Sequence, residues 1–416
     1  MLPGNYKPVK SHYEKIIVAC CFLSLFVNIG LNSTSFAVYQ PYIVSMPDIG
    51  DAAGSIILST RILVSAVATM LVNRFYDFLE ARVGLSLAMV LTAAAFFVYS
   101  AASTLPAFLA GAVLAGIAYG LGGMVATAML VNRWFKSGIG TAVGVASVGS
   151  GVAGFVIPVA ATSIIEAHSL VAAFACEGVL SLVLAVVVFL FLRNRPSDLG
   201  LKPHESNIAK SGRGKEQAAR IRRGVELSVR ERWLVLAAMA MLGAFSMSAI
   251  AYLSVLFVSS GYDIRLAAVL LSVAGVCLTI AKFLVGEMFD RLGTPIASFM
   301  MFIVLVVGFV LACLSGCEVP AVVIGAAVCI GAGLSLGSVG LSVWSIELTS
   351  LELRVKSIKN CQVAYSLGGF AMNAIPGPLK ELTGTYVTSY AIMLALVVAT
   401  AFIILGMYRR VSARGQ

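Results

Sequence analysis

The chain has 416 residues, of which 60% are hydrophobic and only 12% are charged. A soluble domain has about 25% charged residues, so this composition excludes a soluble globular protein. The formal net charge of +10 would suit a nucleic-acid partner, but the basic residues are distributed among the ends of apolar segments. We therefore expect a lipid bilayer, and no nucleic acid, as the surroundings of this chain.

Twelve apolar segments follow one another, each close to the roughly 20 residues that cross the hydrocarbon layer. We expect transmembrane helices near residues 16–44, 55–74, 83–103, 107–132, 138–164, 170–193, 232–259, 265–286, 295–315, 320–346, 358–383 and 387–408. The first segment is too long for a signal-peptide core and lacks a cleavage site, which predicts a retained helix and a mature protein that begins at Met1. The links leave no room for a soluble catalytic domain.

The basic residues predict the orientation of these helices. If both termini are cytoplasmic, all but four of the 29 Lys and Arg residues fall on cytoplasmic ends or links, as the positive-inside rule requires. The longest hydrophilic run, from Asn194 to Arg230, divides the chain in the middle. We predict a six-helix bundle over 1–193, a basic cytoplasmic linker over 194–231 and a second six-helix bundle over 232–416, in the cell inner membrane.

The two halves resemble each other weakly. A shift of 213 residues places Phe75–Leu79 on Met288–Leu292, and a shift of 215 places Gly116 on Gly331. Internal repeats of this kind are typical of duplicated transporter folds.

A loop signature lies between the eighth and ninth expected helices. The segment Gly286–Gly293, with the sequence GEMFDRLG, resembles the G-x-x-x-D-R-x-G motif of the major facilitator superfamily. The corresponding segment of the first half matches this motif only in part. Asp77 is kept, but Asn73 stands in place of the glycine and Phe78 in place of the basic residue. The resemblance implies two pseudo-symmetric six-helix bundles of all-α structure.

The same resemblance implies a gate on the cytoplasmic side. An Asp at a helix end can pair with a basic group and hold the cytoplasmic ends of the two bundles together, whereas the simpler alternative is a turn-forming loop. The gating residues expected on this basis are Asp77, Gly286, Asp290, Arg291 and Arg133.

Within the superfamily, the chain resembles the monocarboxylate and oxalate:formate antiporter branch. Asn132–Phe135 (NRWF), followed by a glycine-spaced run, is similar to the link between helices 4 and 5 of that branch, and Tyr39–Pro41 loosely resembles its Tyr-x-x-Pro. Lys282 stands where the branch usually has an arginine that binds the substrate carboxylate, and Ala364–Phe370 lacks the lysine of the oxalate carriers. Close similarity to an oxalate exchanger is therefore not expected.

Two cations lie inside apolar segments. Lys282 is eight residues, about 12 Å of helix, from Asp290, and a cation at the bilayer centre costs about 2.5 to 3.5 kcal/mol. Since a lysine stem spans only part of that distance, a functional site is favoured over a side chain that snorkels to the headgroups. Arg61 lies about 24 Å from Asp77, where it could face a central cavity or snorkel outward to Asp48 and Asp51. If both face the cavity, an anion is the natural partner.

Glu177 is the only acid deep inside a segment of the first half. Because the sixth helix is peripheral in the implied fold, a structural role, or a contact with Ser or backbone groups, is favoured over a proton site.

Sparse polar residues complete the expected lining of a central site. Each one is more often a helix-to-helix hydrogen bond than a ligand contact, but the tyrosines could also close a dry site and orient a carboxylate. The substrate-binding candidates are Lys282, Arg61, Tyr39, Tyr119, Asn32, Tyr252, Tyr365 and Asn373.

The sequence contains no Walker loop, no H-E-x-x-H motif and no catalytic triad pattern, so neither an enzyme nor a cofactor is expected. We predict a monomeric secondary transporter that moves a small organic anion, a mono- or dicarboxylate, by alternating access, as proton symporter or exchanger. The alternatives are an exporter of a hydrophobic or cationic compound and a non-transporting membrane sensor.

Overall fold

The computed structural model describes residues 13–135, 139–201, 227–317, 319–349 and 354–414, and every element in this part of the chain is helical. Eleven stretches are long and apolar enough to cross a membrane. The stretch formed by α16 and α17 supplies the twelfth crossing. The predicted all-α membrane fold is confirmed.

The helices follow the predicted order, and several extend beyond the predicted bounds. The first bundle contains α1 (Tyr13–Leu25), the π-helix η1 (Phe26–Ser35), the 3-10 helix η2 (Phe36–Val38), α2 (Gln40–Val44), α3 (Gly50–Phe78), α4 (Ala81–Ala101), α5 (Leu105–Gly122), α6 (Met124–Trp134), α7 (Ile139–Ala167) and α8 (Leu170–Phe191). After η3 (Pro196–Leu199), the second bundle contains α10 (Val229–Ala251), α11 (Leu253–Ser259), α12 (Ile264–Leu292), α13 (Thr294–Cys313), η5 (Ser315–Cys317), α14 (Pro320–Gly333), η6 (Leu334–Gly337), α15 (Val339–Glu347), α16 (Arg354–Asn373), α17 (Pro376–Thr383) and α18 (Val387–Arg414).

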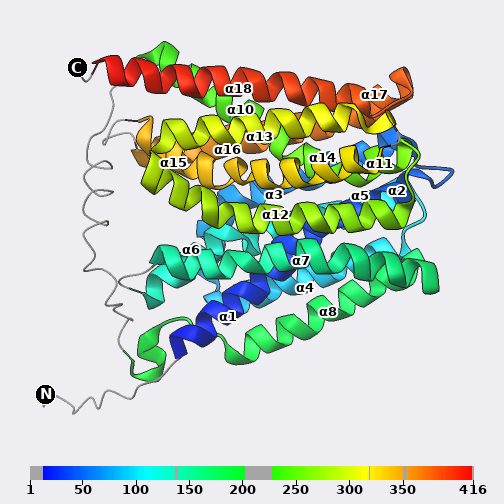
Figure 1. The fold of residues 1–416 in the computed structure, drawn as a ribbon. Helices are drawn as coiled ribbons and strands as arrows, with labels where there is room; N and C mark the ends of the chain where they lie inside the picture. Colours follow the sequence, from blue (N-terminus) through cyan, green and yellow to red (C-terminus); the bar gives the residue numbers. More distant parts are fainter. Residues whose placement is uncertain (1–12, 136–138, 202–226, 318, 350–353, 415–416) are drawn as a thin grey trace, which may run out of the picture.

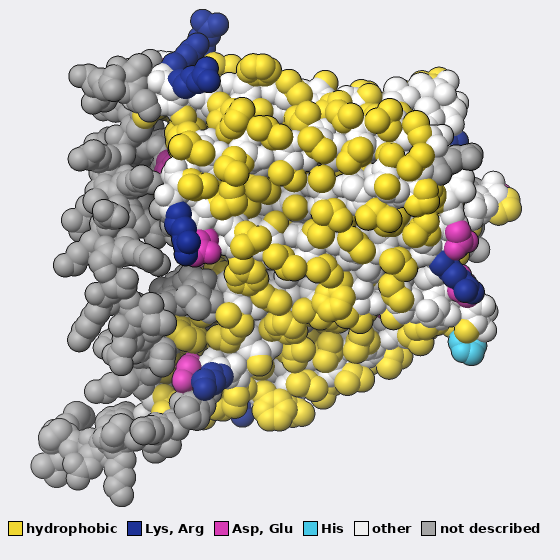
Figure 2. Space-filling model, viewed as in Figure 1, with side chains coloured by type: hydrophobic (Ala, Val, Ile, Leu, Met, Phe, Trp, Pro, Cys, Tyr) yellow, Lys and Arg dark blue, Asp and Glu magenta, His cyan; other side chains and the backbone are white. Residues whose placement is uncertain are grey.

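The long helices run side by side, and in Figure 1 α1, α4, α6, α7 and α8 of the first bundle lie below the second bundle. The start of α1 and the end of α18 lie at one end of the bundles, which we call the terminal face. The opposite end, with the links 45–49, 102–104, 168–169, 260–263 and 384–386, is the distal face. Figure 2 shows a broad hydrophobic band between two rims that hold the charged side chains, as a bilayer requires. Of the predicted linker 194–231, residues 202–226 lie outside the described residues.

The first crossing is not the single helix predicted over 16–44. Its middle is a π-helix, in which a backbone carbonyl does not accept the usual hydrogen bond from the amide four residues later in the chain. Side chains replace those bonds: Asn32 Nδ2 donates to the Asn28 carbonyl at 3.3 Å, and Ser35 Oγ donates to the Gly30 carbonyl at 2.7 Å. Short polar side chains therefore stabilise an irregular segment, and such segments are frequent at functional sites.

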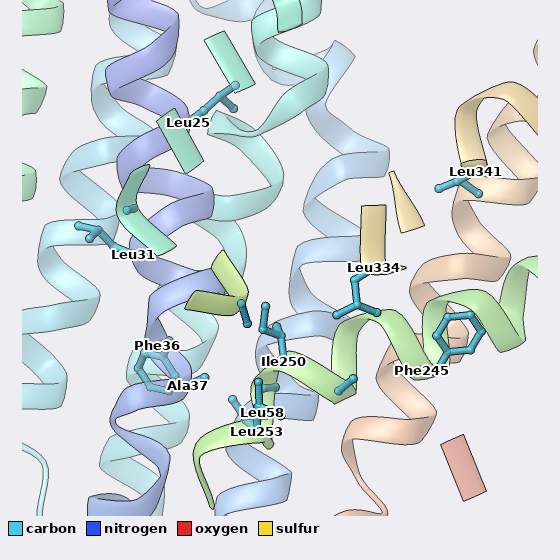
Figure 3. Close-up of a cluster of buried hydrophobic side chains, with 14 of the residues drawn as sticks. Leu25, Leu31, Phe36, Ala37, Leu58, Phe245, Ile250, Leu253, Leu334 and Leu341 are labelled. Carbon is cyan, nitrogen blue, oxygen red and sulfur yellow. The ribbon is translucent and has the colours of Figure 1, made fainter. Parts of the chain in front are cut away.

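Small residues join the two bundles along α7 and α12. A Cβ added at Gly275 of α12 would lie 2.7 Å from the Gly154 carbonyl oxygen of α7, and one added at Gly154 would meet the Thr34 side chain at 2.5 Å and the Gly275 Cα at 3.8 Å. The backbones can approach this closely only because both positions are glycine. Towards the distal face, Leu58, Ile250 and Leu253 lie together beside Ala37 (Figure 3), so apolar packing also closes the seam there.

Candidate functional site

Arg61 is buried in the first bundle, with 5% of its surface exposed. Its guanidinium donates a hydrogen bond to the backbone carbonyl of Asn32 and lies 5.3 Å from the centre of the Phe36 ring. The side chain therefore points at the irregular part of the first crossing. Among the described residues no carboxylate forms an ion pair with it, so the alternative in which it reaches Asp48 and Asp51 is wrong. The Asn32 carbonyl belongs to the π-helix, in which carbonyls lack their usual helical partners. This available acceptor explains why the Arg61 side chain points towards it.

Tyrosines from three other places surround this cation. Tyr99 of α4, Tyr119 of α5 and Tyr252, at the junction of α10 and α11, lie within electrostatic reach of Arg61. We call Arg61, Phe36 and these three tyrosines the Arg61 cluster. The Tyr99 hydroxyl is buried and has no hydrogen-bond partner in the described chain, which typically costs about 1–3 kcal/mol. An anionic oxygen beside Arg61 would satisfy a donor of this kind.

Lys282 lies on the inner face of α12. The residues that α12 exposes to lipid include Val276, Ile280 and Leu284. Lys282 is two positions from Ile280 and from Leu284, about 200° around the helix, and its side chain is half-buried. It therefore faces the protein, which argues against snorkelling. No described residue is recorded as a hydrogen-bond or ion-pair partner of Lys282.

The predicted site residues do not all converge on one point. The Tyr39 hydroxyl donates to Glu177 of α8, and the Asn373 side chain donates to Ser248 at 2.8 Å. Tyr365 of α16 lies beside Gly337 and within electrostatic reach of Tyr119 of the first bundle. Tyr39 and Asn373 have other partners and are less available to a ligand than their positions in the sequence suggested.

Asn32 belongs to a buried polar network inside the first bundle. Its amide donates to Thr92 Oγ1 at 2.9 Å, and Thr92 donates to Asn28 Oδ1 at 2.9 Å. Asn28 in turn donates to Ser24 at 3.1 Å. Asn32 Oδ1 remains buried without a described partner. This network stabilises the π-helix, in which the Asn32 carbonyl accepts a hydrogen bond from Arg61.

Polar contacts join the two bundles at the distal face. The Tyr252 hydroxyl donates to the Asn373 carbonyl at 2.6 Å and lies 2.7 Å from Ser55 Oγ of α3, which also accepts from the Gly377 amide at 2.7 Å. Asp51 accepts from the Tyr386 hydroxyl and lies 3.9 Å from the Lys380 ammonium. The ends of α3 and α17 are thus held together, and the distal face is closed in this conformation.

Further along the same face, the side chain of Glu381 caps α3 by accepting from the Ala52 amide at 3.0 Å. Arg265 pairs with Glu166 across the seam at 2.6 Å, and Ser254 donates to the Ala37 carbonyl. These bonds lie in the same half of the molecule as the Tyr252 and Asp51 contacts.

The predicted gate residues lie at the terminal face. Asp77 is exposed, and Arg291 pairs with Glu287 of its own helix at 2.5 Å. Arg133 lies near Tyr76 within the first bundle. No group lies close to the Cβ position of Gly286, and the Asp290 side chain lies outside the described residues. The cross-bundle gate at this face therefore remains a prediction.

Sequence reasoning missed Phe36, Tyr99 and Ser55. All three lie in apolar or small-residue stretches where nothing separates them from ordinary packing residues. For Glu177 the sequence favoured a structural role, or a contact with Ser or backbone groups, and did not identify Tyr39 as its partner. Only the distances between helices could show these contacts.

Comparison with known proteins agrees with this architecture. The family model described as Major Facilitator Superfamily matches residues 21–373. Among solved structures, the nucleoside transporter NupG is similar at 15% identity with a TM-score of 0.71, covering 96% of this chain and 99% of that one. The D-xylose-proton symporter is similar at 13% identity and 0.69, covering 94% and 96%.

A third similar structure is a bacterial homologue of the human lysosomal transporter Spinster, described as inward-facing and unoccupied. It has 15% identity and a TM-score of 0.66, and the match covers 97% of this chain and 98% of that one. At these identities the likeness concerns the fold alone.

Proposed function

The chain belongs to the major facilitator superfamily, and we propose that this secondary transporter moves a small organic anion, a mono- or dicarboxylate, by alternating access as a proton symporter or exchanger. The single observation that supports an anion is the pair of inward-facing cations, Arg61 and Lys282, neither of which has a described acidic partner. A cation in the bilayer without a counter-charge is costly, and a bound carboxylate would supply that charge.

The two cations would act differently on such a substrate. Arg61 is fixed by Asn32 and Phe36, so its position is preorganised, and the remaining N–H groups can bind a carboxylate in a planar fork. Lys282 is a point charge on a flexible stem. It lies about one turn on the terminal side of Thr279, which packs against Gly151 of the first bundle. We therefore assign attraction of the anion to Lys282 and its orientation to Arg61.

Three further assignments complete the proposal. The terminal face is cytoplasmic, because the basic residues of the sequence concentrate there, and the protein lies in the cell inner membrane as a monomer. The distal closure then corresponds to an inward-facing state. The Asp77, Asp290 and Arg291 group would close the terminal face in the opposite state. The branch to which the sequence points is that of the monocarboxylate and oxalate:formate carriers.

The test is thermal stabilisation of the purified protein by a panel of short carboxylates, since a ligand that binds only the folded state must stabilise it. We expect one or more carboxylates to raise the Tm of the wild-type protein. Losing the partner of a buried charge typically costs about 3–5 kcal/mol, so Lys282→Gln should weaken this binding at least about a hundredfold. Lys282→Arg should retain part of it.

Lys359→Gln is the matched control, because Lys359 is an exposed cation of α16; it should bind like the wild type. The proposal is wrong if Lys282→Gln binds the carboxylates as tightly as the wild type. It is also wrong if only nucleosides, pentoses or cationic compounds stabilise the protein. Uptake of the stabilising carboxylate into vesicles then separates a transporter from a sensor, which would bind without accumulation.

A further inference from the structure

Glu177 is a buried carboxyl group that the anion site does not use. It lies in α8, seven residues from Leu170 at the distal end of the helix, or about 10 Å along the axis. Only 6% of its surface is exposed. One oxygen, Oε1, accepts a hydrogen bond from the Tyr39 hydroxyl, and the other, Oε2, is buried without a described partner. A carboxyl group in this setting requires an explanation.

The groups around Glu177 do not neutralise a negative charge. Tyr39 faces it from the first crossing, and Tyr39 is the one side chain that interacts with the carboxyl group electrostatically in the described chain. From α4, Tyr99 packs on Phe174 with ring centres 5.6 Å apart, but the charged group that interacts with Tyr99 is Arg61. The described parts of α1, η1 and α7, which also pack against α8, bring no charged side chain within reach of it.

The free-energy cost of burial strongly favours a neutral Glu177 over a charged one. A buried carboxylate without a counter-charge costs far more than a buried hydroxyl that lacks an acceptor, which costs about 1–3 kcal/mol. The Tyr39 hydrogen bond offsets only part of the cost of a charge. In the conformation described here, with the distal face closed, Glu177 therefore holds a proton.

Aromatic rings connect Glu177 to the Arg61 cluster. The Tyr39 ring lies 4.2 Å from the Phe174 ring and 5.8 Å from the Phe36 ring, centre to centre. Phe36 in turn packs against the Arg61 guanidinium at 5.3 Å. Tyr39 and Phe36 both belong to the irregular part of the first crossing, which can rearrange more easily than a regular helix.

From this arrangement we propose that Glu177 is the proton-binding site that couples transport of the anion to a proton gradient, with Tyr39 as its positioning residue. The inference rests on the proposed function and adds the coupling ion to it. When the distal face opens, the carboxyl group exchanges its proton with that side. Tyr39 then shifts with the charge on Glu177, and through Phe36 the position of Arg61 changes.

The first test needs no substrate. Infrared difference spectra of the purified wild-type protein and Glu177→Gln at neutral pH should show the carbonyl stretch of a protonated carboxylic acid, present only in the wild type. Glu166→Gln is the control, because the Glu166 carboxylate pairs with the Arg265 guanidinium at 2.6 Å and should not contribute to that band. An ionised Glu177 in the wild type would overturn the proposal, whatever the substrate is.

The second test measures coupling in vesicles, with the carboxylate that gives the largest thermal stabilisation. In Glu177→Gln the amide oxygen still accepts from Tyr39, so the fold is kept and the site is permanently neutral. We expect accumulation driven by a pH gradient to fall at least about tenfold, while exchange of labelled for unlabelled carboxylate persists and loses its pH dependence.

Two results in vesicles would contradict the coupling role. If Glu177→Gln accumulates the carboxylate in response to a pH gradient as the wild type does, Glu177 is structural. If exchange is lost together with accumulation although the variant keeps the wild-type Tm, the residue acts in binding and not in coupling. When no carboxylate binds the wild-type protein, the anion proposal fails, and the infrared result still decides whether Glu177 holds a proton.

Discussion

The distal and terminal faces of this transporter are held in different ways. At the distal face, bonds such as those of Ser55 and Asp51 join α3 of the first bundle to α17 and to the link 384–386 of the second. At the terminal face, the described bonds stay within a bundle: Asn194 donates to Glu80 at 2.6 Å, and Tyr408 donates to Glu347 at 2.8 Å. At the terminal face the described hydrogen bonds therefore stabilise each bundle separately, whereas at the distal face they join the two bundles.

This difference indicates how the protein can change state. A rigid-body rotation of the bundles has to break the distal contacts, but it can leave the bonds inside each bundle unchanged. The seam between α7 and α12, where Gly154 meets Gly275, lies between the two faces and can serve as a pivot. The distal contacts thus set the free energy of one state, and changes to them should shift the equilibrium between states.

The largest shift is expected at Gly377. A Cβ at this position would lie 1.9 Å from the Asp51 carbonyl oxygen and 2.4 Å from Ser55 Oγ, so Gly377→Ala should prevent the observed distal closure. Overpacking typically costs about 1–3 kcal/mol or more, which lowers the population of closed molecules by about fivefold to a hundredfold. The measurement is the distance between spin labels at Ser45 and Leu382, which are both exposed, in a background without the native cysteines.

Gly406→Ala is the matched control, because a Cβ placed there has no atom within 4 Å apart from its chain neighbours and the backbone of its own helix. It should leave the label distances unchanged. Equal distance distributions for Gly377→Ala and the wild type would show that the distal contact of α3 with α17 does not hold the closed state.

An intermediate shift is expected for Asp51→Asn. The amide oxygen can still accept from Tyr386, but the charge opposite Lys380 at 3.9 Å is lost. A partly buried pair of this kind contributes about 1 kcal/mol, so the closed population should fall about fivefold in the same spin-label measurement. Asp48→Asn, which removes an exposed acid of the link 45–49 that precedes α3, is the control. If Asp48→Asn lowered the closed population more than Asp51→Asn does, the net charge of the link, and not the pair of Asp51 with Lys380, would stabilise the closed distal face.

The sequence predicted the helices well because a span of about 20 apolar residues has no other stable form in lipid. It placed Lys282 in the eighth helix for the same reason, and the side on which it faces follows from helical periodicity. The π-helix of the first crossing was not predicted, because its stability depends on Asn32, Ser35 and Arg61 meeting carbonyls in the folded protein.

The partners across the bundles were harder still to predict. Ser55 and Tyr252 are 197 residues apart in sequence, and no local pattern links them. Arg61 illustrates the same limit, since the sequence allowed two orientations and only the position of Asn32 decided between them. Tyr39 was a good candidate for the ligand, but Glu177 binds its hydroxyl.

The smallest shift is expected for Glu166→Gln. The Arg265 side chain is 71% exposed and that of Glu166 28%, so water and salt screen the pair. Its removal should change the spin-label distances less than Asp51→Asn does, and the remaining effect should vanish at high salt, where the Asp51 effect persists in part because its side chains are 25% exposed. A shift as large as that of Gly377→Ala would mean that electrostatics at the seam, and not the close approach of α3 and α17, determines which face is closed.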